Sequence, residues 1–143
     1  MKLRYIHGAL AVAVFAQSAQ ATTEVKTLPL EPVLSQQPAG SEIALYFGDQ
    51  AHPAIKAALG DTSQGTRIAR RVDDQVTACN RALSEALDKL RSYAHDHNAN
   101  AVVNIRTNFH STQTASATEF TCGVSGSAAA LRVQGDVVVL EAK

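Results

Sequence analysis

Few side chains in this sequence have the type and spacing that catalysis requires. Residues 123–127, Gly-Val-Ser-Gly-Ser, resemble a nucleophile elbow, but the run lacks the final glycine of G-x-S-x-G and no histidine follows it. We interpret it as a turn between two strands. The sequence contains no G-x-x-x-x-G-K-[ST] phosphate-binding loop. We therefore expect no catalytic serine at this position and no cofactor.

The densest group of metal-ligand residue types is His95-Asp96-His97. Two residues two positions apart on a helix point about 200° away from each other, so the two imidazoles do not share one site on a regular helix. His110 lies at the far end of the next expected strand. We expect exposed histidines and no metal ligands, and a weak metal site at the helix end remains the alternative.

A hydrolase or redox enzyme with an unrecognised site is a second alternative. It requires at least two titratable side chains that converge in one pocket. The candidates for such a site are Asp49, His52 and Glu119.

Three arginines, Arg67, Arg70 and Arg71, form a small basic cluster that Asp73 and Asp74 follow directly. Local ion pairing accounts for this pattern. A patch for an anionic ligand or a partner is the alternative.

The chain has two cysteines, Cys79 on the apolar face of an expected helix and Cys122 at the end of an expected strand. Two cysteines that face one core in an oxidising compartment are candidates for a structural disulfide. The bridge would close a loop of 44 residues, worth roughly 4 kcal/mol in chain entropy. Two free thiols are the alternative, and the absence of C-x-x-C spacing argues against redox chemistry.

The compartment follows from residues 1–21. Lys2 and Arg4 precede an apolar run at residues 8–16, and the segment ends Ala-Gln-Ala, as in a secretory signal peptide. The apolar run is too short to span a bilayer as a helix. We expect cleavage after Ala21, a periplasmic location and no membrane span in the mature protein.

The elements that position these residues are read from hydrophobic periodicity. Residues 22–40 contain prolines that favour an extended lead-in without a helix, part of which could form an edge strand. The strongest signal is an amphipathic helix over 74–97, with capping aspartates at its start and Asn98 as its left-handed end. The other expected elements are strands at 42–48, 66–71, 101–109, 116–122 and 129–140, a short helix at 53–60 and a loop at 61–65.

Within these strands, the alternation over 101–109 places Val103, Ile105, Thr107 and Phe109 on one face, and Gly135 marks a bulge or kink. One long helix on a mainly antiparallel sheet, in the order strand-helix-strand-strand-strand, predicts an α+β fold of two layers. We expect a signal peptide at 1–21, a lead-in at 22–40 and a single domain at 41–143.

The charge balance also limits the function. The 143 residues contain 13 Lys and Arg against 13 Asp and Glu, and removal of residues 1–21 would leave a formal charge of −2. A broadly basic surface for nucleic acid is not expected.

Three segments carry a family resemblance. They are Ala-Cys-Asn-Arg-Ala-Leu at 78–83, Ala-Asn-Ala-Val-Val-Asn-Ile at 99–105 and Ala-Thr-Glu-Phe-Thr-Cys at 117–122, with Tyr-Phe-Gly-Asp-Gln at 46–50 as a further match. They resemble a family of small secreted bacterial proteins of unknown function that often carry the label "excinuclease ATPase subunit". That activity needs phosphate-binding loops and metal-bound cysteines, which this chain lacks. More distantly, the pattern is similar to heavy-metal-binding domains and to the sensor domain of the Rcs envelope-stress lipoprotein, which implies a fold only.

We therefore expect a non-enzymatic module that binds an envelope protein or a small ligand. The expected contact surfaces are the turn at 46–50, the arginines at 67–71 and the exposed helix face.

Overall fold

The computed structural model describes residues 22–37 and 41–142. The predicted signal peptide and its cleavage site after Ala21 lie outside these residues. The described part of the chain forms a sheet of seven strands and two helices. The strands are β1 (Glu24–Pro29), β2 (Ala44–Phe47), β3 (Ile55–Ala69), β4 (Ala101–Phe109), β5 (Thr112–Thr114), β6 (Glu119–Val124) and β7 (Ala128–Leu140), and the helices are α1 (Glu31–Leu34) and α2 (Gln75–Asp96).

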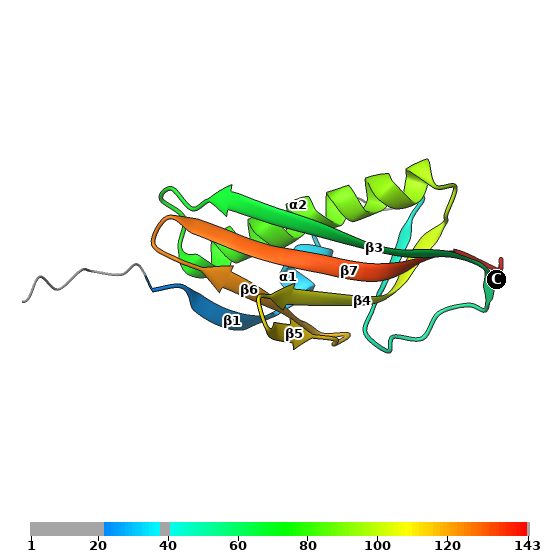
Figure 1. Ribbon diagram of the computed structural model, residues 1–143, viewed down its shortest axis with the longest axis horizontal. Helices are drawn as coiled ribbons and strands as arrows, with labels where there is room; N and C mark the ends of the chain where they lie inside the picture. Colours follow the sequence, from blue (N-terminus) through cyan, green and yellow to red (C-terminus); the bar gives the residue numbers. More distant parts are fainter. Residues whose placement is uncertain (1–21, 38–40, 143) are drawn as a thin grey trace, which may run out of the picture.

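Strand β7 organises the sheet (Figure 1). It pairs with β3 along one edge, while its other edge pairs first with β6 and then with β4. β1 extends the sheet beyond β6, β2 lies beyond β4, and β5 also pairs with β4. The β2–β4 pair is parallel and the others are antiparallel. The predicted α+β class is confirmed.

Helix α2 forms where the sequence predicts it. The Asp74 carboxylate accepts a hydrogen bond from the Thr77 N–H at 2.7 Å, and Asn98 ends the helix with a φ of 59°. The apolar stripe of α2 is buried against β3, β6 and β7, while Val76 in the first turn is 46% exposed. Neither helix within the described residues has the length and hydropathy that crossing a bilayer needs.

Cys79 of α2 and Cys122 of β6 lie at disulfide distance, as the sequence predicted. Their Cα atoms are 5.9 Å apart, and both side chains are fully buried in the main hydrophobic core. The link joins the first turns of α2 to β6, two elements that are far apart in the chain.

The prediction for residues 53–65 is wrong. Residues 55–60 of the expected helix and the expected loop at 61–65 belong to β3, a continuous strand of 15 residues that also takes in the strand expected at 66–71 as far as Ala69. Thr62, Thr66 and Ile68 are the buried positions of an alternating pattern, and two of them are polar residues that a search for apolar periodicity overlooks. Two register shifts, at Ile55/Ala57 and at Ala58/Asp61, interrupt the alternation further.

The lead-in is also partly mispredicted. The expected edge strand is present as β1, but residues 31–34 form the short helix α1 despite their proline. Pro32 lies in the first turn of the helix, where a backbone N–H would have no acceptor within the helix, so the missing N–H costs no hydrogen bond.

Strand β6 begins three residues later than predicted. Ser116 Oγ accepts hydrogen bonds from the N–H groups of Thr118 and Glu119, and these bonds form a turn before the strand.

A bulge in β4 changes which side chains share a face. Val103 pairs with Asp136 and Arg106 pairs with Gln134, so two residues of β4 oppose Gly135 alone. The bulge lies in β4 opposite the predicted glycine rather than in β7. The predicted single face of β4 is therefore wrong, because the bulge turns Val103 away from the core to which Ile105 belongs.

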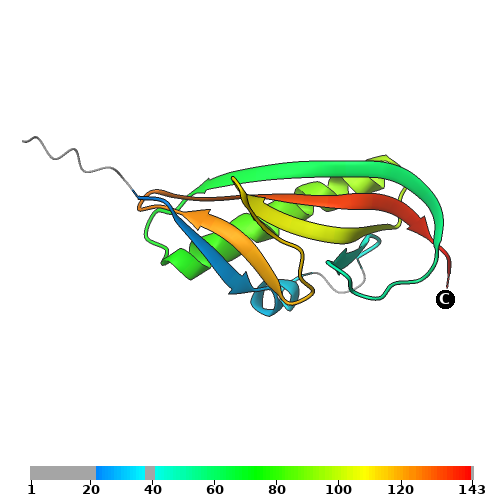
Figure 2. The same ribbon diagram turned by 60° about the horizontal axis from the view of Figure 1, so that its bottom comes forward.

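The sheet has two different faces. The helix-covered face carries Ala129, Leu131, Val133 and Val137 of β7, all buried against α2. The open face carries the alternate residues of β7 and their partners on β3 and β4. At the end of the open face near β2, a small buried cluster of Ala101, Val103, Val138 and Leu140 packs against Ala44 and Tyr46. The connection from β2 to β3 passes around this end (Figure 2).

Candidate functional site

The other end of the open face contains a groove between β3, β7 and the end of β4. It has a volume of about 600 Å³. Arg67 of β3, Arg132 of β7 and His110 after β4 line it, and Ala130 and Phe109 supply apolar surface. A second hollow of about 290 Å³ shares four of these residues and continues toward Thr23 and Ser125. We call the two hollows together the cationic groove, since arginines line them and no acidic residue of the described ranges does.

Strand register brings the two arginines together. Arg67 pairs with Ala130, and Gly65 pairs with Arg132, so the arginines are diagonal neighbours on one face of the sheet. Asn108 of β4 lies opposite Arg132 on the other side of β7. Three strands that are distant in sequence therefore contribute hydrogen-bond donors to one surface.

Arg132 is held in place across the sheet. Its Nη1 donates to Ser63 Oγ at 3.1 Å. Its guanidinium lies over Gly65, where a Cβ atom would be only 2.9 Å from Nη2. A guanidinium has five N–H donors, so the bond to Ser63 leaves donors for a ligand. Among the described residues, neither Arg67 nor Arg132 forms an ion pair with a carboxylate.

Phe109 and His110 form the aromatic part of the groove. The Phe109 ring covers Gly123 so closely that a Cβ atom there would overlap it. The His110 ring stands edge-on to Phe109, with centroids 4.2 Å apart. His110 adopts a left-handed φ of 51° in the turn after β4, and this turn places its side chain at the groove.

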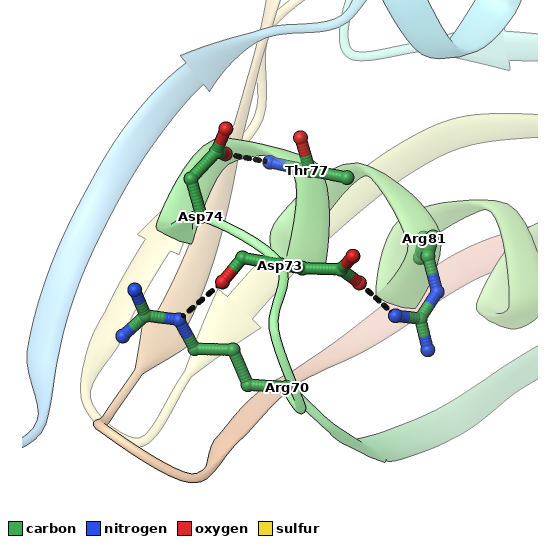
Figure 3. Close-up of polar contacts among 5 residues, drawn as sticks. All are labelled: Arg70, Asp73, Asp74, Thr77 and Arg81. Carbon is green, nitrogen blue, oxygen red and sulfur yellow. Dashed lines mark hydrogen bonds and ion pairs between the residues drawn. The ribbon is translucent and has the colours of Figure 1, made fainter.

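Arg70 of the predicted basic cluster binds the backbone instead of lining the groove (Figure 3). Arg70 donates to two backbone carbonyls, of Asp73 at 2.8 Å and of Ser125 at 3.1 Å. The Asp73 carboxylate pairs with Arg81 of α2 instead. The predicted local ion pairing of the arginines is therefore wrong, and only Arg67 of the cluster lines the groove.

Asp74 acts as the helix cap. Its carboxylate accepts a hydrogen bond from the Thr77 backbone N–H, and this bond lowers the pKa of the carboxyl below the ordinary value of 3.8. The aspartates next to the basic cluster thus stabilise the start of α2, which leaves the charge of Arg67 without a neighbouring carboxylate partner among the described residues.

The three candidates for an enzyme active site, Asp49, His52 and Glu119, lie in different local environments. His52 faces Tyr46, with ring centroids 5.6 Å apart, and its Nδ1 lies 2.7 Å from the carbonyl oxygen of Pro53. Asp49 is exposed in the turn after β2, and Glu119 is exposed at the start of β6. Within the described chain, no hydrogen bond or ion pair joins Asp49, His52 and Glu119.

The two histidines at the end of α2 also separate. His95 Nε2 lies 3.8 Å from a carboxylate oxygen of Glu42, while His97 stacks on Tyr93 with ring centroids 4.0 Å apart. Within residues 22–37 and 41–142, no three His, Cys, Asp or Glu side chains are placed to hold a metal ion together.

Sequence reasoning named Arg67 but missed Arg132, Asn108 and Phe109. The available signal was alternation in residues 128–134, where every second side chain is small or polar. This alternation points to a shared surface with Arg67 only when residues 55–69 are recognised as the strand that pairs with 128–134. Comparisons of the chain with protein-family models, with curated proteins and with solved structures found no match.

Proposed function

We propose that the protein is a secreted, periplasmic binding module that holds an anionic group of its ligand in the cationic groove. The observation that carries the proposal is the convergence of Arg67 and Arg132 on an open face without a carboxylate lining the groove. Guanidinium groups bind carboxylates and phosphates through charge-assisted hydrogen bonds, often two at a time.

The surroundings of the arginines favour binding. The groove lies on the face of the sheet that α2 does not cover, so a ligand can reach it without displacing the helix. Asn108 adds an amide beside Arg132, and the position of Arg132 is already fixed by Ser63. The Arg132 side chain then loses less conformational freedom when a ligand binds, and this smaller entropy cost favours affinity.

One feature of the sequence and one of the structure support the proposed compartment. Residues 1–21 have the pattern of a signal peptide, and the cysteines lie at disulfide distance. Mass spectrometry of the protein from the periplasm is expected to find an N-terminus at Thr22 and one linked peptide pair that contains Cys79 and Cys122. An intact Met1 or two free thiols would contradict this part of the proposal.

The binding proposal is tested with inorganic phosphate as the probe. Addition of sodium phosphate to the ¹⁵N-labelled protein, at constant ionic strength, is expected to shift the amide signals of Gly65, Arg67, Asn108 and Arg132 saturably. The double variant Arg67→Gln/Arg132→Gln should lose the response. The matched control Lys56→Gln/Arg71→Gln removes two exposed positive charges outside the groove and should retain it. An equal response in both variants would refute the groove as the anion site.

A further inference from the structure

We infer that the ligand of the cationic groove is an extended segment of acidic polypeptide with carboxylates on alternate residues. This inference rests on the proposed function and specifies the class of ligand. It follows from the shape of the groove, from the spacing of its charges and from the nature of its far end.

The shape favours a chain over a small ion. The two hollows meet at Arg67, Phe109, His110 and Ala130 and extend on both sides of them. A single phosphate or carboxylate would leave most of this volume to water, where solvent weakens an exposed ion pair. A ligand that runs along the groove contacts both arginines and the apolar surface together.

The spacing of the two arginine positions along the strands matches that of alternate residues in a β-strand. The Arg132 guanidinium lies over Gly65, and Arg67 follows Gly65 by two residues on the same face of β3. Two residues of extended chain span about 6.6–6.8 Å, and alternate side chains of such a chain point the same way. An extended ligand that runs along β3 and β7 therefore presents its residues i and i+2 to the two arginines with the same repeat.

The far end of the groove is apolar. Gly123 and the Phe109 ring that covers it lie beside Arg67, on the other side of Ala130. Ala128 follows two residues further along the strands, with Ser125 next to it in the second hollow. The next ligand side chain on the same face, two residues further on, meets Ala128. The pattern that fits the groove is acidic-x-acidic-x-apolar.

Two peptides of equal composition test the spacing. The first is acetyl-Glu-Thr-Glu-Thr-Leu-Thr-amide, and the second, acetyl-Glu-Glu-Thr-Thr-Leu-Thr-amide, differs only in the position of the second carboxylate. With a fluorescent label on each, anisotropy titration of the protein is expected to show roughly tenfold tighter binding of the first, the difference of one lost charge-assisted contact. Arg67→Gln/Arg132→Gln should abolish the preference, and Lys56→Gln/Arg71→Gln should keep it.

The possible outcomes separate this inference from the proposed function. Equal affinity of both peptides, still dependent on Arg67 and Arg132, would overturn the spacing argument and leave the anion site standing. Binding of phosphate without binding of either peptide would do the same. Arginine-dependent binding to phosphatidylglycerol vesicles but not to the peptides would replace the polypeptide by a membrane surface. Failure of phosphate, peptides and vesicles alike would overturn both proposals.

Discussion

The two faces of the sheet are made by the same strands and have opposite chemistry. On β7, Leu131 and Val133 are buried beneath α2, while Arg132 between them is exposed on the open face. On β3, Thr66 and Ile68 are buried, and Arg67 between them lines the groove. Each strand therefore contributes to the core and to the groove through alternate residues.

This division separates stability from binding. The helix-covered face derives its stability from apolar burial and from the link between Cys79 and Cys122. The open face holds charges that contribute little to the core and remain available to a ligand. Substitutions on one face should therefore change unfolding, and substitutions on the other should change binding.

The largest effect is expected from the cysteine pair. Cys79→Ala/Cys122→Ala should lower the free energy of unfolding by roughly 4 kcal/mol, because the unfolded chain regains the freedom of a 44-residue loop. Urea unfolding with and without reductant measures this change, and reductant should have no effect on the double variant. The phosphate response of the groove should persist wherever the variant is folded. Equal stability of the variant and the oxidised protein would contradict a structural disulfide.

An intermediate effect is expected at two glycines, one on each face. In Gly135→Ala the new Cβ would lie 2.6 Å from Val102 Cγ1 within the core. Overpacking there should cost roughly 1–3 kcal/mol of unfolding free energy. In Gly123→Ala the new Cβ would displace the Phe109 ring, which is half-buried at the groove. That variant should lose less stability than Gly135→Ala and should alter the phosphate-induced NMR shifts.

Gly126→Ala is the control for both, since no atom lies within 4 Å of the added carbon. Thermal unfolding and the phosphate titration of the three variants separate the faces. If Gly123→Ala left the groove response unchanged, Phe109 would not form part of the binding surface.

The smallest effect on stability is expected from Asp74, the N-cap of helix α2. The hydrogen bond from the Thr77 N–H lowers the pKa of Asp74, so the ionised carboxylate stabilises the folded state at neutral pH. This stabilisation is complete above the unfolded-state pKa and is lost as pH falls through the lower folded-state pKa. The stability advantage of the wild-type protein over Asp74→Asn should therefore shrink between about pH 5 and pH 2. Urea unfolding across this range measures it, and an advantage that grew toward low pH would show that the carboxylate does not stabilise the helix.

The sequence predicted those parts of the fold that depend on local patterns. The apolar repeat of α2, its cap at Asp74 and its end at Asn98 all lie within one segment, and β4 has the predicted bounds because β-branched residues recur along its length. Of β3 only the last residues, within the strand expected at 66–71, were predicted. The rest was missed because threonines occupy two of its buried positions and register shifts interrupt its period. The groove was missed because Arg67 and Arg132 meet only through the pairing of β3 with β7.

The irregular register of β3 also has a consequence for contacts between molecules. A 15-residue strand with an edge that pairs with no strand of the described chain is a template on which another chain could add a strand. The shifts around Ala57 and Gly60 break the spacing that an incoming strand would need at that end, and Lys89 Nζ donates to the Gly65 carbonyl at 2.9 Å. At these two places the strand that presents Arg67 to a ligand is a poor template for edge-to-edge pairing between copies of the protein.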